Sequence, residues 1–338
     1  MAKRKESKKE NKRKRKILLA LLLVVFTGII LTANTYAWFT SNKTITVDAI
    51  DVQVTTANGI QVSTDATNWK TVITNTDLNN TLLASTLYPT NTNQLPFKSS
   101  NAQIAPVSTG GTVTSGKLKM YLGELGTDTN DNKVLTATAE TDTKGAVGNY
   151  VAFDLFFLVT QNSVVKLGSG SSVTTSTGAT NKGLKNAARV AWINEGSASA
   201  GDVTSAQGLA NGSTALIWEP NNNVHTDAAI ADALSTYGAT ITGTTQVANY
   251  YGVDAAIATP GVALYNLNPG TSFKQVTPGL KTQDGALTAD QNWFSLNAGI
   301  TKVRFYLWVE GQDYDCENNA SGDAISFNMN FVLQDNNP

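Results

Sequence analysis

The chain has 338 residues, 25 Lys and Arg, 26 Asp and Glu, one His and a formal net charge of −1. Its single cysteine, Cys316, excludes an intrachain disulfide framework, so a large hydrophobic core must supply the stability. Charged residues are only 15% of the chain, and Thr, Asn, Ser and Gly are abundant, which predicts a neutral polar surface with many strands and turns.

Residues 1–37 have the pattern of a secretory signal. Ten basic residues precede the 15-residue apolar run Ile17–Leu31, and Thr35 and Ala37 are the small residues at the −3 and −1 positions. The pattern predicts a signal helix cut by a signal peptidase between Ala37 and Trp38. The alternative is an uncleaved signal anchor, but 15 helical residues rise about 22 Å, short of the roughly 30 Å hydrocarbon core. The membrane is therefore expected to be a partner only through an uncleaved signal.

Removal of this segment changes the charge balance of the protein. It takes away ten of the 25 basic residues and two of the 26 acidic ones, which leaves 15 basic and 24 acidic residues and a net charge of −9. Phosphate should repel such a body, so binding to DNA or RNA is not expected. We see no apolar tail or LPxTG motif at the C-terminus and expect a secreted product, in the extracellular matrix or at the cell surface.

Strand patterns begin directly after the predicted cleavage site. Apolar residues alternate along Thr44–Ala49 and again, in the other phase, along Ile50–Val54. Because side chains alternate faces along a strand, the change of phase between the two runs predicts a bulge or a corner. Asn58-Gly59 then predicts a hairpin turn leading into Ile60–Val62.

The rest of the chain is also rich in strand patterns. Apolar runs predict strands at 117–122, 150–159, 163–167, 187–193, 214–218, 262–267, 300–309 and 324–333. Residues 75–115 are expected to be long surface connections, and 227–234 is the only helix predicted outside the signal. The chain is thus predicted to be all-β. We expect a signal at 1–37, an N-terminal strand segment at 38–54, and an antiparallel β-sandwich with long polar loops at 55–338.

The sequence offers little hydrolytic machinery. His225 is the only histidine, and it is expected to be an exposed loop residue. Zincin spacing and a Gly-x-Ser-x-Gly nucleophile turn are both missing, so no catalytic residue, no metal centre and no cofactor site is predicted.

One loop has the composition of a weak calcium site. Asp313, Asp315 and Glu317 are followed by two asparagines between two long predicted strands, and oxygen ligands at this spacing can hold Ca²⁺. The alternative is a turn whose carboxylates and amides bind backbone groups. The sequence leaves both interpretations open.

The predicted mature N-terminus is unusual for a soluble protein. Trp38 and Phe39 would expose roughly 400 Å² if they were unpacked. The alternating strand behind them either pairs within its own domain or adds to the sheet edge of another subunit.

The segment Thr35–Thr44 (TYAWFTSNKT), the strand that follows it, and the tail Trp308–Cys316 (WVEGQDYDC) resemble the TasA/camelysin family. These are exported proteins of Gram-positive bacteria that a SipW-type signal peptidase processes. The resemblance implies a jelly-roll sandwich and biofilm-matrix fibres in which the N-terminal strand of one subunit completes the sheet of the next. Some relatives are described as metalloproteases, an activity that one His and no zinc motif do not support here.

The sequence therefore favours a secreted, noncatalytic structural protein whose partner is a second copy of itself. The expected assembly strand carries the side chains Trp38, Phe39, Ile45, Val47, Ile50 and Val52. The second hypothesis is a monomeric cell-surface or glycan-binding module, and the third is a metalloprotease.

Overall fold

We describe the fold from a computed structural model. It describes residues 38, 45–55, 60–83, 86–96, 104–222, 224–237, 250–263, 271–283 and 285–334. The predicted signal, with Ala37 at its end, lies outside the described residues, as do Phe39 and the Asn58-Gly59 turn. Among the residues that are described, no helix is both long and apolar enough to cross a membrane.

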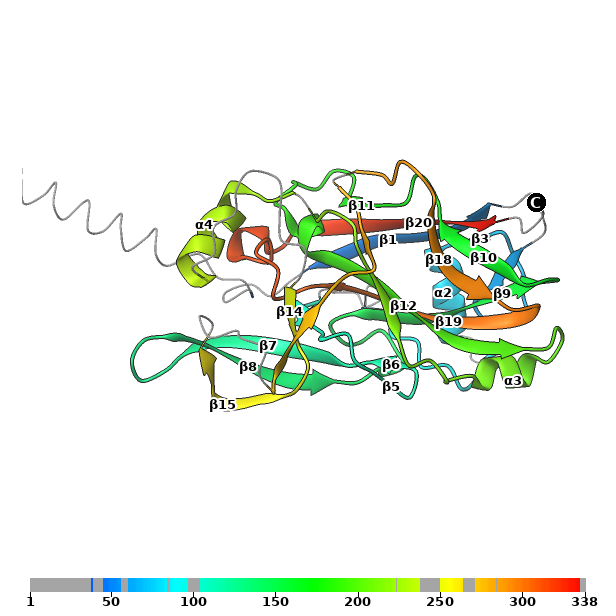
Figure 1. Cartoon of the computed structure of the whole chain (residues 1–338), viewed down its shortest axis with the longest axis horizontal. Helices are drawn as coiled ribbons and strands as arrows, with labels where there is room; N and C mark the ends of the chain where they lie inside the picture. Colours follow the sequence, from blue (N-terminus) through cyan, green and yellow to red (C-terminus); the bar gives the residue numbers. More distant parts are fainter. Residues whose placement is uncertain are drawn as a thin grey trace, which may run out of the picture. The chain divides into compact units, whose positions relative to one another are not determined.

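Two large sheets form the body of the domain (Figure 1). The first sheet has the order β18 (Gln291–Leu296), β10 (Ser163–Leu167), β20 (Ala324–Gln334), β1 (Thr46–Thr55), β3 (Val72–Ile73), and β11 (Ser172–Thr175) also pairs with β20. The second sheet has the order β17 (Leu280–Lys281), β13 (Ala215–Glu219), β12 (Ala188–Ala198), β19 (Gly299–Val309), β9 (Val151–Val159), β2 (Gln61–Ser63).

The inner faces of these two sheets share one hydrophobic core. Side chains alternate along β20 as the sequence predicted, so that Phe331 is fully buried between the sheets. Its ring lies 5.9 Å from that of Phe157 in β9 and 5.7 Å from that of Phe305 in β19. Rings from opposite sheets in edge or tilted contact are typical of a sandwich core. The prediction of an all-β sandwich is confirmed.

A smaller set of strands covers the outer face of the second sheet. The hairpin β7 (Met120–Thr127) and β8 (Lys133–Glu140) extends through β4 (Val107–Ser108) on one side and β15 (Ile257–Ala263) on the other. Two small sheets pair β5 (Val113–Thr114) with β6 (Lys117–Leu118), and β14 (Tyr250–Val253) with β16 (Phe273–Val276). Met120 and Leu118 pack in a cluster with Trp308 and Tyr306 of β19. Because both faces of β9 and β19 are covered, these strands are buried almost without alternation.

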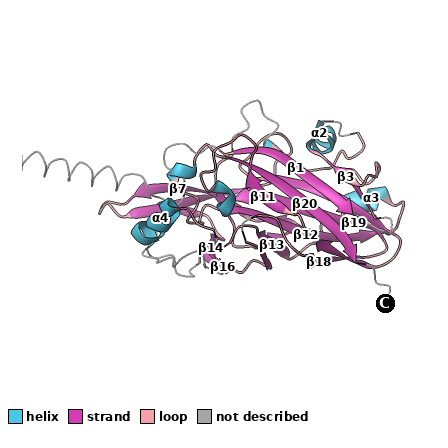
Figure 2. Cartoon of the chain, turned by 90° about the horizontal axis from the view of Figure 1, so that it is seen from above, coloured by secondary structure: helices cyan, strands magenta, loops and turns pink. Residues whose placement is uncertain are grey.

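Several pairings differ from the sequence predictions. The expected hairpin around Asn58-Gly59 is wrong, because β1 lies in the first sheet and β2 pairs with β9 in the second. The sandwich is also not purely antiparallel, since β1 pairs with β20 in parallel, as Figure 2 shows, and β13 pairs with β17 in parallel. Periodicity reports which face of a strand is buried but does not identify its neighbour.

The helices follow local signals in the sequence. The predicted helix is confirmed as α4 (Asp227–Tyr237), which begins after Thr226, whose hydroxyl accepts the Ala229 N–H at 3.1 Å. Further helices are α2 (Asn75–Leu83), α3 (Val203–Gly208) and the 3-10 turns η2 (Leu184–Ala187) and η4 (Asn318–Ala320). Of these, α2 corrects the expectation of a structureless connection over 75–115.

Candidate functional site

Strand β1 is an interior strand of its own domain. It pairs with β20 along nine residue positions, from Thr46 opposite Ala324 to Thr55 opposite Val332. On its other side it meets β3 at Val52 and Gln53. The register shifts between Val47 and Ala49, so the predicted bulge is present, close to the expected position after Ala49. This bulge lets both alternating runs bury their apolar side chains in one core.

The aliphatic side chains predicted for assembly fill that core. Ile45, Val47, Ile50 and Val52 are 0 to 5% exposed and belong to the main hydrophobic cluster. Ile45 also exchanges backbone hydrogen bonds of 2.9 and 3.0 Å with Ile104. In a single chain, therefore, the segment pairs within its own domain. The groove between β20 and β3 accepts a strand whose apolar side chains alternate as they do in β1, because those side chains fill the core.

Trp38, at the predicted mature N-terminus, is inserted in a slot of the same domain. Its side chain is 1% exposed. The indole ring lies against Gly123 of β7 and Gly311 after β19, where an added Cβ would come within 2.5 to 2.8 Å of ring atoms. Its Nε1 donates a 3.0 Å hydrogen bond to Oε1 of Gln312, which is also buried. We call Gly123, Gly311 and Gln312 with the surrounding apolar side chains the Trp38 slot.

The floor of the Trp38 slot is acidic and largely buried. The main-chain N–H of Trp38 donates to the sulfur of Cys316. Burial raises the pKa of this thiol well above its usual range; the Trp38 hydrogen bond opposes the rise, and the nearby carboxylates of Asp313, Glu310 and Glu317 add to it. The thiol is therefore protonated, and the sulfur that accepts the Trp38 N–H lies near these carboxyl groups.

Glu310, like Glu317, is a fully buried acid in this floor. It is 0% exposed, and burial raises its pKa to about 7 although hydrogen bonds from Ser108, Trp308 and Gln312 oppose the rise. Its hydrogen-bond donors are neutral and include the Trp308 indole N–H and the Gln312 backbone N–H, both at 3.1 Å. A carboxyl in this environment favours a positive charge beside it.

The candidate calcium loop is turned inward. The carboxylate of Asp313 forms an ion pair with the guanidinium of Arg189 in β12 at 2.6 Å. The carboxylate of Asp315 pairs with Nδ1 of His225 at 2.5 Å. Glu317 is fully buried. The prediction of an exposed His225 is wrong, because its side chain is only 8% exposed and is bound to Asp315, a contact 90 residues away that local sequence does not reveal.

His225, Asp313 and Asp315 bring three potential metal ligands within 4.8 Å of one another. Burial lowers the pKa of His225, but the hydrogen bond to Asp315 and the neighbouring carboxylates outweigh this and raise it, which favours the charged imidazole. With Arg189 on Asp313 and His225 on Asp315, both carboxyl groups already have side-chain partners. The calcium site stays a prediction, and an internal ion-pair cluster explains these contacts without a metal.

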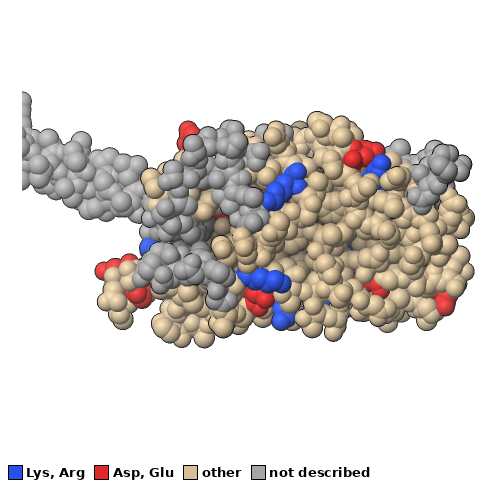
Figure 3. Space-filling view, in the orientation of Figure 1, with Lys and Arg blue, Asp and Glu red and all other residues tan. Residues whose placement is uncertain are grey.

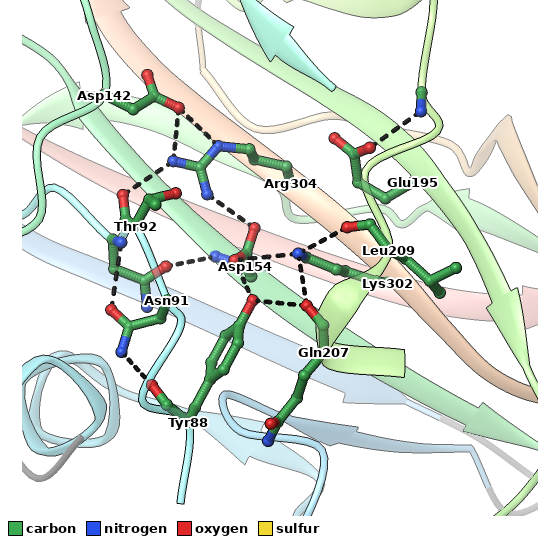
Figure 4. A network of polar contacts seen from close by, with 12 residues as sticks. Tyr88, Asn91, Thr92, Asp142, Asp154, Glu195, Gln207, Leu209, Lys302 and Arg304 are labelled. Carbon is green, nitrogen blue, oxygen red and sulfur yellow. Dashed lines mark hydrogen bonds and ion pairs between the residues drawn. The ribbon is translucent and has the colours of Figure 1, made fainter. Parts of the chain in front are cut away.

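A second buried network joins the outer loops to the second sheet (Figure 4). Arg304 of β19 donates to Asp154 at 2.8 Å and to Asp142 at 2.9 Å. Burial would raise the pKa of Asp154, but Arg304 and Lys302 outweigh it and hold the pKa below its usual range. The Tyr88 hydroxyl also donates to Asp154, at 2.8 Å. The sequence analysis missed this network, in which directly bonded residues lie up to 212 positions apart.

A polar cavity of about 290 Å³ lies beside this network. Its lining includes Asp65, Asn68, Lys70 and Asp77, groups that could bind hydroxyls of a sugar. Among its described lining residues the one aromatic is Tyr88, which is 1% exposed and packs edge-on against Phe156 at 5.4 Å. These lining residues thus present no open aromatic face on which a sugar ring would stack.

Charge is sparse on the molecular surface. On the face drawn in Figure 3, the Lys and Arg side chains are few and separated, and neutral residues cover most of the area. This agrees with the neutral polar surface that the composition predicted. Comparison of the chain with protein-family models, with curated proteins and with solved structures finds no match.

Proposed function

We propose that this chain is an exported structural protein that assembles head to tail into extracellular fibres. The assembly element is the N-terminal segment from Trp38 to Thr55, and the role is noncatalytic. One observation carries the proposal: the first strand after the predicted cleavage site is a complete interior strand of the sandwich, held between β20 and β3.

Exchange of β1 between subunits conserves the interactions that hold it. The same nine positions of β20 would pair with an incoming β1, and the same four aliphatic side chains would fill the same core. Each buried side chain contributes about 1.5–3 kcal/mol, so an empty groove is strongly unfavourable. An incoming strand from a second copy satisfies it as well as the chain's own strand does. A head-to-tail exchange that does not close on itself produces a filament.

Processing gives this exchange a natural control point. Before cleavage the segment is continuous with the basic, apolar signal at 1–37, which tethers it at the membrane. After cleavage its N-terminal end is free to reach another subunit. The resemblance to the TasA/camelysin family supports the same assignment, including an extracellular, biofilm-matrix location.

A disulfide between β1 and β20 tests the proposal directly. Asp51 and Asn328 are exposed and opposite each other across the two strands, at the spacing that a disulfide spans. D51C/N328C protein starting at Trp38 would be allowed to assemble, examined by electron microscopy and then oxidised. If β1 is exchanged, a denaturing gel without reductant shows a ladder of covalent oligomers, which collapses to monomer on reduction.

The matched control uses a pair within one sheet that exchange does not separate. Lys166 of β10 is opposite Val332 of β20, so oxidised K166C/V332C should give filaments but only monomers on the denaturing gel. Filaments of D51C/N328C that yield only intrachain disulfides would refute strand exchange. Protein that stays monomeric would favour the binding-module hypothesis, with the cavity beside Tyr88 as its first candidate site.

A further inference from the structure

We infer that the Trp38 slot is a docking site for a newly formed N-terminal tryptophan, which it recognises by its indole ring and its α-ammonium group together. The inference rests on the processing step of the proposed function, cleavage after Ala37, and not on polymerisation. Its ligand is defined by chemistry: a chain end with a free amine on a tryptophan.

The slot fits an indole and little else. Glycine on two sides leaves room for a flat ring, and an added Cβ at Gly123 or Gly311 would overlap it. Gln312 accepts from Nε1, a donor that phenylalanine lacks. Tyr121, Leu135 and Phe273 belong to the same apolar cluster.

The backbone of Trp38 indicates that the slot suits a chain end. Its φ is +68°, in the left-handed region, which bulky residues rarely adopt because the side chain clashes with the neighbouring peptide. This angle is defined by the peptide bond to Ala37. Hydrolysis of that bond removes the preceding carbonyl and with it the strain. The usual penalty corresponds to a roughly 5- to 30-fold bias of the docked state in favour of the cleaved chain.

The acidic groups in the floor of the slot also indicate that the slot suits a free chain end. Cleavage converts the Trp38 amide into an ammonium with three donors, one of which replaces the present N–H bond to Cys316. The fully buried Glu310 lies near the same thiol, and its hydrogen-bond donors, the Trp308 indole N–H and the Gln312 backbone N–H, are neutral. An ammonium therefore brings a positive charge toward this buried carboxyl group, and an amide does not.

Docking of the Trp38 end links processing of the chain to its assembly. The slot belongs to the same domain that holds β1, so one copy can use it for its own Trp38 and, on exchange, for the Trp38 of its neighbour. In both cases a processed chain end occupies the slot without the left-handed strain that the Ala37–Trp38 peptide bond imposes. The slot thereby distinguishes cleaved from uncleaved subunits.

Chemical protection of the α-amine tests the inference. Protein starting at Trp38 would be released from a removable leader and treated at neutral pH with an amine-acylating reagent, and the modification of its N-terminal peptide would be followed by mass spectrometry. We expect the Trp38 amine to react at least about 10-fold more slowly than the N-terminal amine of a chain that keeps Ala37. The Gly311→Ala variant, whose Cβ would meet the ring at 2.5 Å, should lose this protection.

The outcomes separate this inference from the proposed function. A Trp38 amine that reacts as fast as the amine of the Ala37-extended chain overturns the slot inference, even if filaments form. Protection without filaments supports the slot and counts against the fibre proposal. The extended chain needs no substitution, so the comparison stands even if Gly311→Ala does not fold.

Discussion

The two ends of the N-terminal segment are held in different ways. Strand β1 is bound along its length by a ladder of nine positions and by several aliphatic side chains, each of which contributes a share. Trp38 is bound by one side chain in one slot, with a single hydrogen bond to Gln312 on its ring. The contacts along β1 set the register and the strength of its binding, whereas the slot around Trp38 selects one residue type. The predictions below disturb each kind of contact in turn.

The largest effect is expected from proline in the middle of the ladder. Val52 is opposite both Met329 of β20 and Ile73 of β3, so Val52→Pro should cost about 3 kcal/mol or more and prevent filament formation. Val47→Pro, at the bulge, should cost less, because a bulge tolerates proline. Urea unfolding followed by circular dichroism checks the order. Equal losses at both sites would mean that the ladder is not what holds β1.

Removal of the Trp38 side chain should destabilise the fold by a comparable amount, but through the loss of contacts at one site. Trp38→Ala empties a slot that is closed on all sides and should lower the free energy of unfolding by about 3–5 kcal/mol. Gly311→Ala should be similarly harmful alone but nearly neutral in the Trp38→Ala background, where its Cβ no longer meets the ring. A double-mutant cycle by thermal or urea unfolding measures this coupling. Additive losses would show that the ring does not lie against Gly311.

The acidic floor predicts a pH dependence for the Ala37-extended chain, in which the Trp38 nitrogen is uncharged. Burial raises the pKa of Glu310 from its ordinary 4.5 to about 7, so the folded state binds a proton that the unfolded state has lost. Stability should fall by about 3 kcal/mol as the pH rises from about 4.5 to about 7. Glu310→Gln should reduce that slope in unfolding measurements at several pH values, and the share due to Glu195, whose pKa burial also raises to about 7, should remain. A slope that persists unchanged in this variant would exclude Glu310 as its source.

The smallest effect is expected from divalent cations. Asp313 and Asp315 are already paired with Arg189 and His225, so millimolar Ca²⁺ or EDTA should move the melting temperature by less than about 1 °C. Calorimetry with and without Ca²⁺ measures this change in melting temperature. A melting temperature that climbs with the logarithm of the Ca²⁺ concentration would establish the calcium site instead.

Several elements could be predicted because their signals are local. Alternation along 324–333 identified the buried face of β20, and the continuous apolar run at 150–159 identified β9 as an interior strand. The phase change near Ala49 gave the bulge in β1 to within two residues. The missed helix α2 also had a local signal, since Thr74 and Asp77 form a capping box in which the Asp77 carboxylate accepts the Thr74 N–H at 3.0 Å.

The candidate site was predicted only in part. Sequence alone identified Trp38 as unusual and Ile45, Val47, Ile50 and Val52 as one apolar face. It did not identify the parallel partner β20, nor the inward turn of His225. These depend on contacts between residues that are far apart in the chain, which no local period records.

The sequence by itself determined the all-β class, the strand faces and the polar surface, because each of these follows from composition or from short-range periodicity. Only the tertiary structure decided that β1 lies between β20 and β3, and that Trp38 enters a slot made by residues up to 274 positions away. The physical reason is that pairing and slot shape are properties of distant segments brought together, and they exist only once the core has formed.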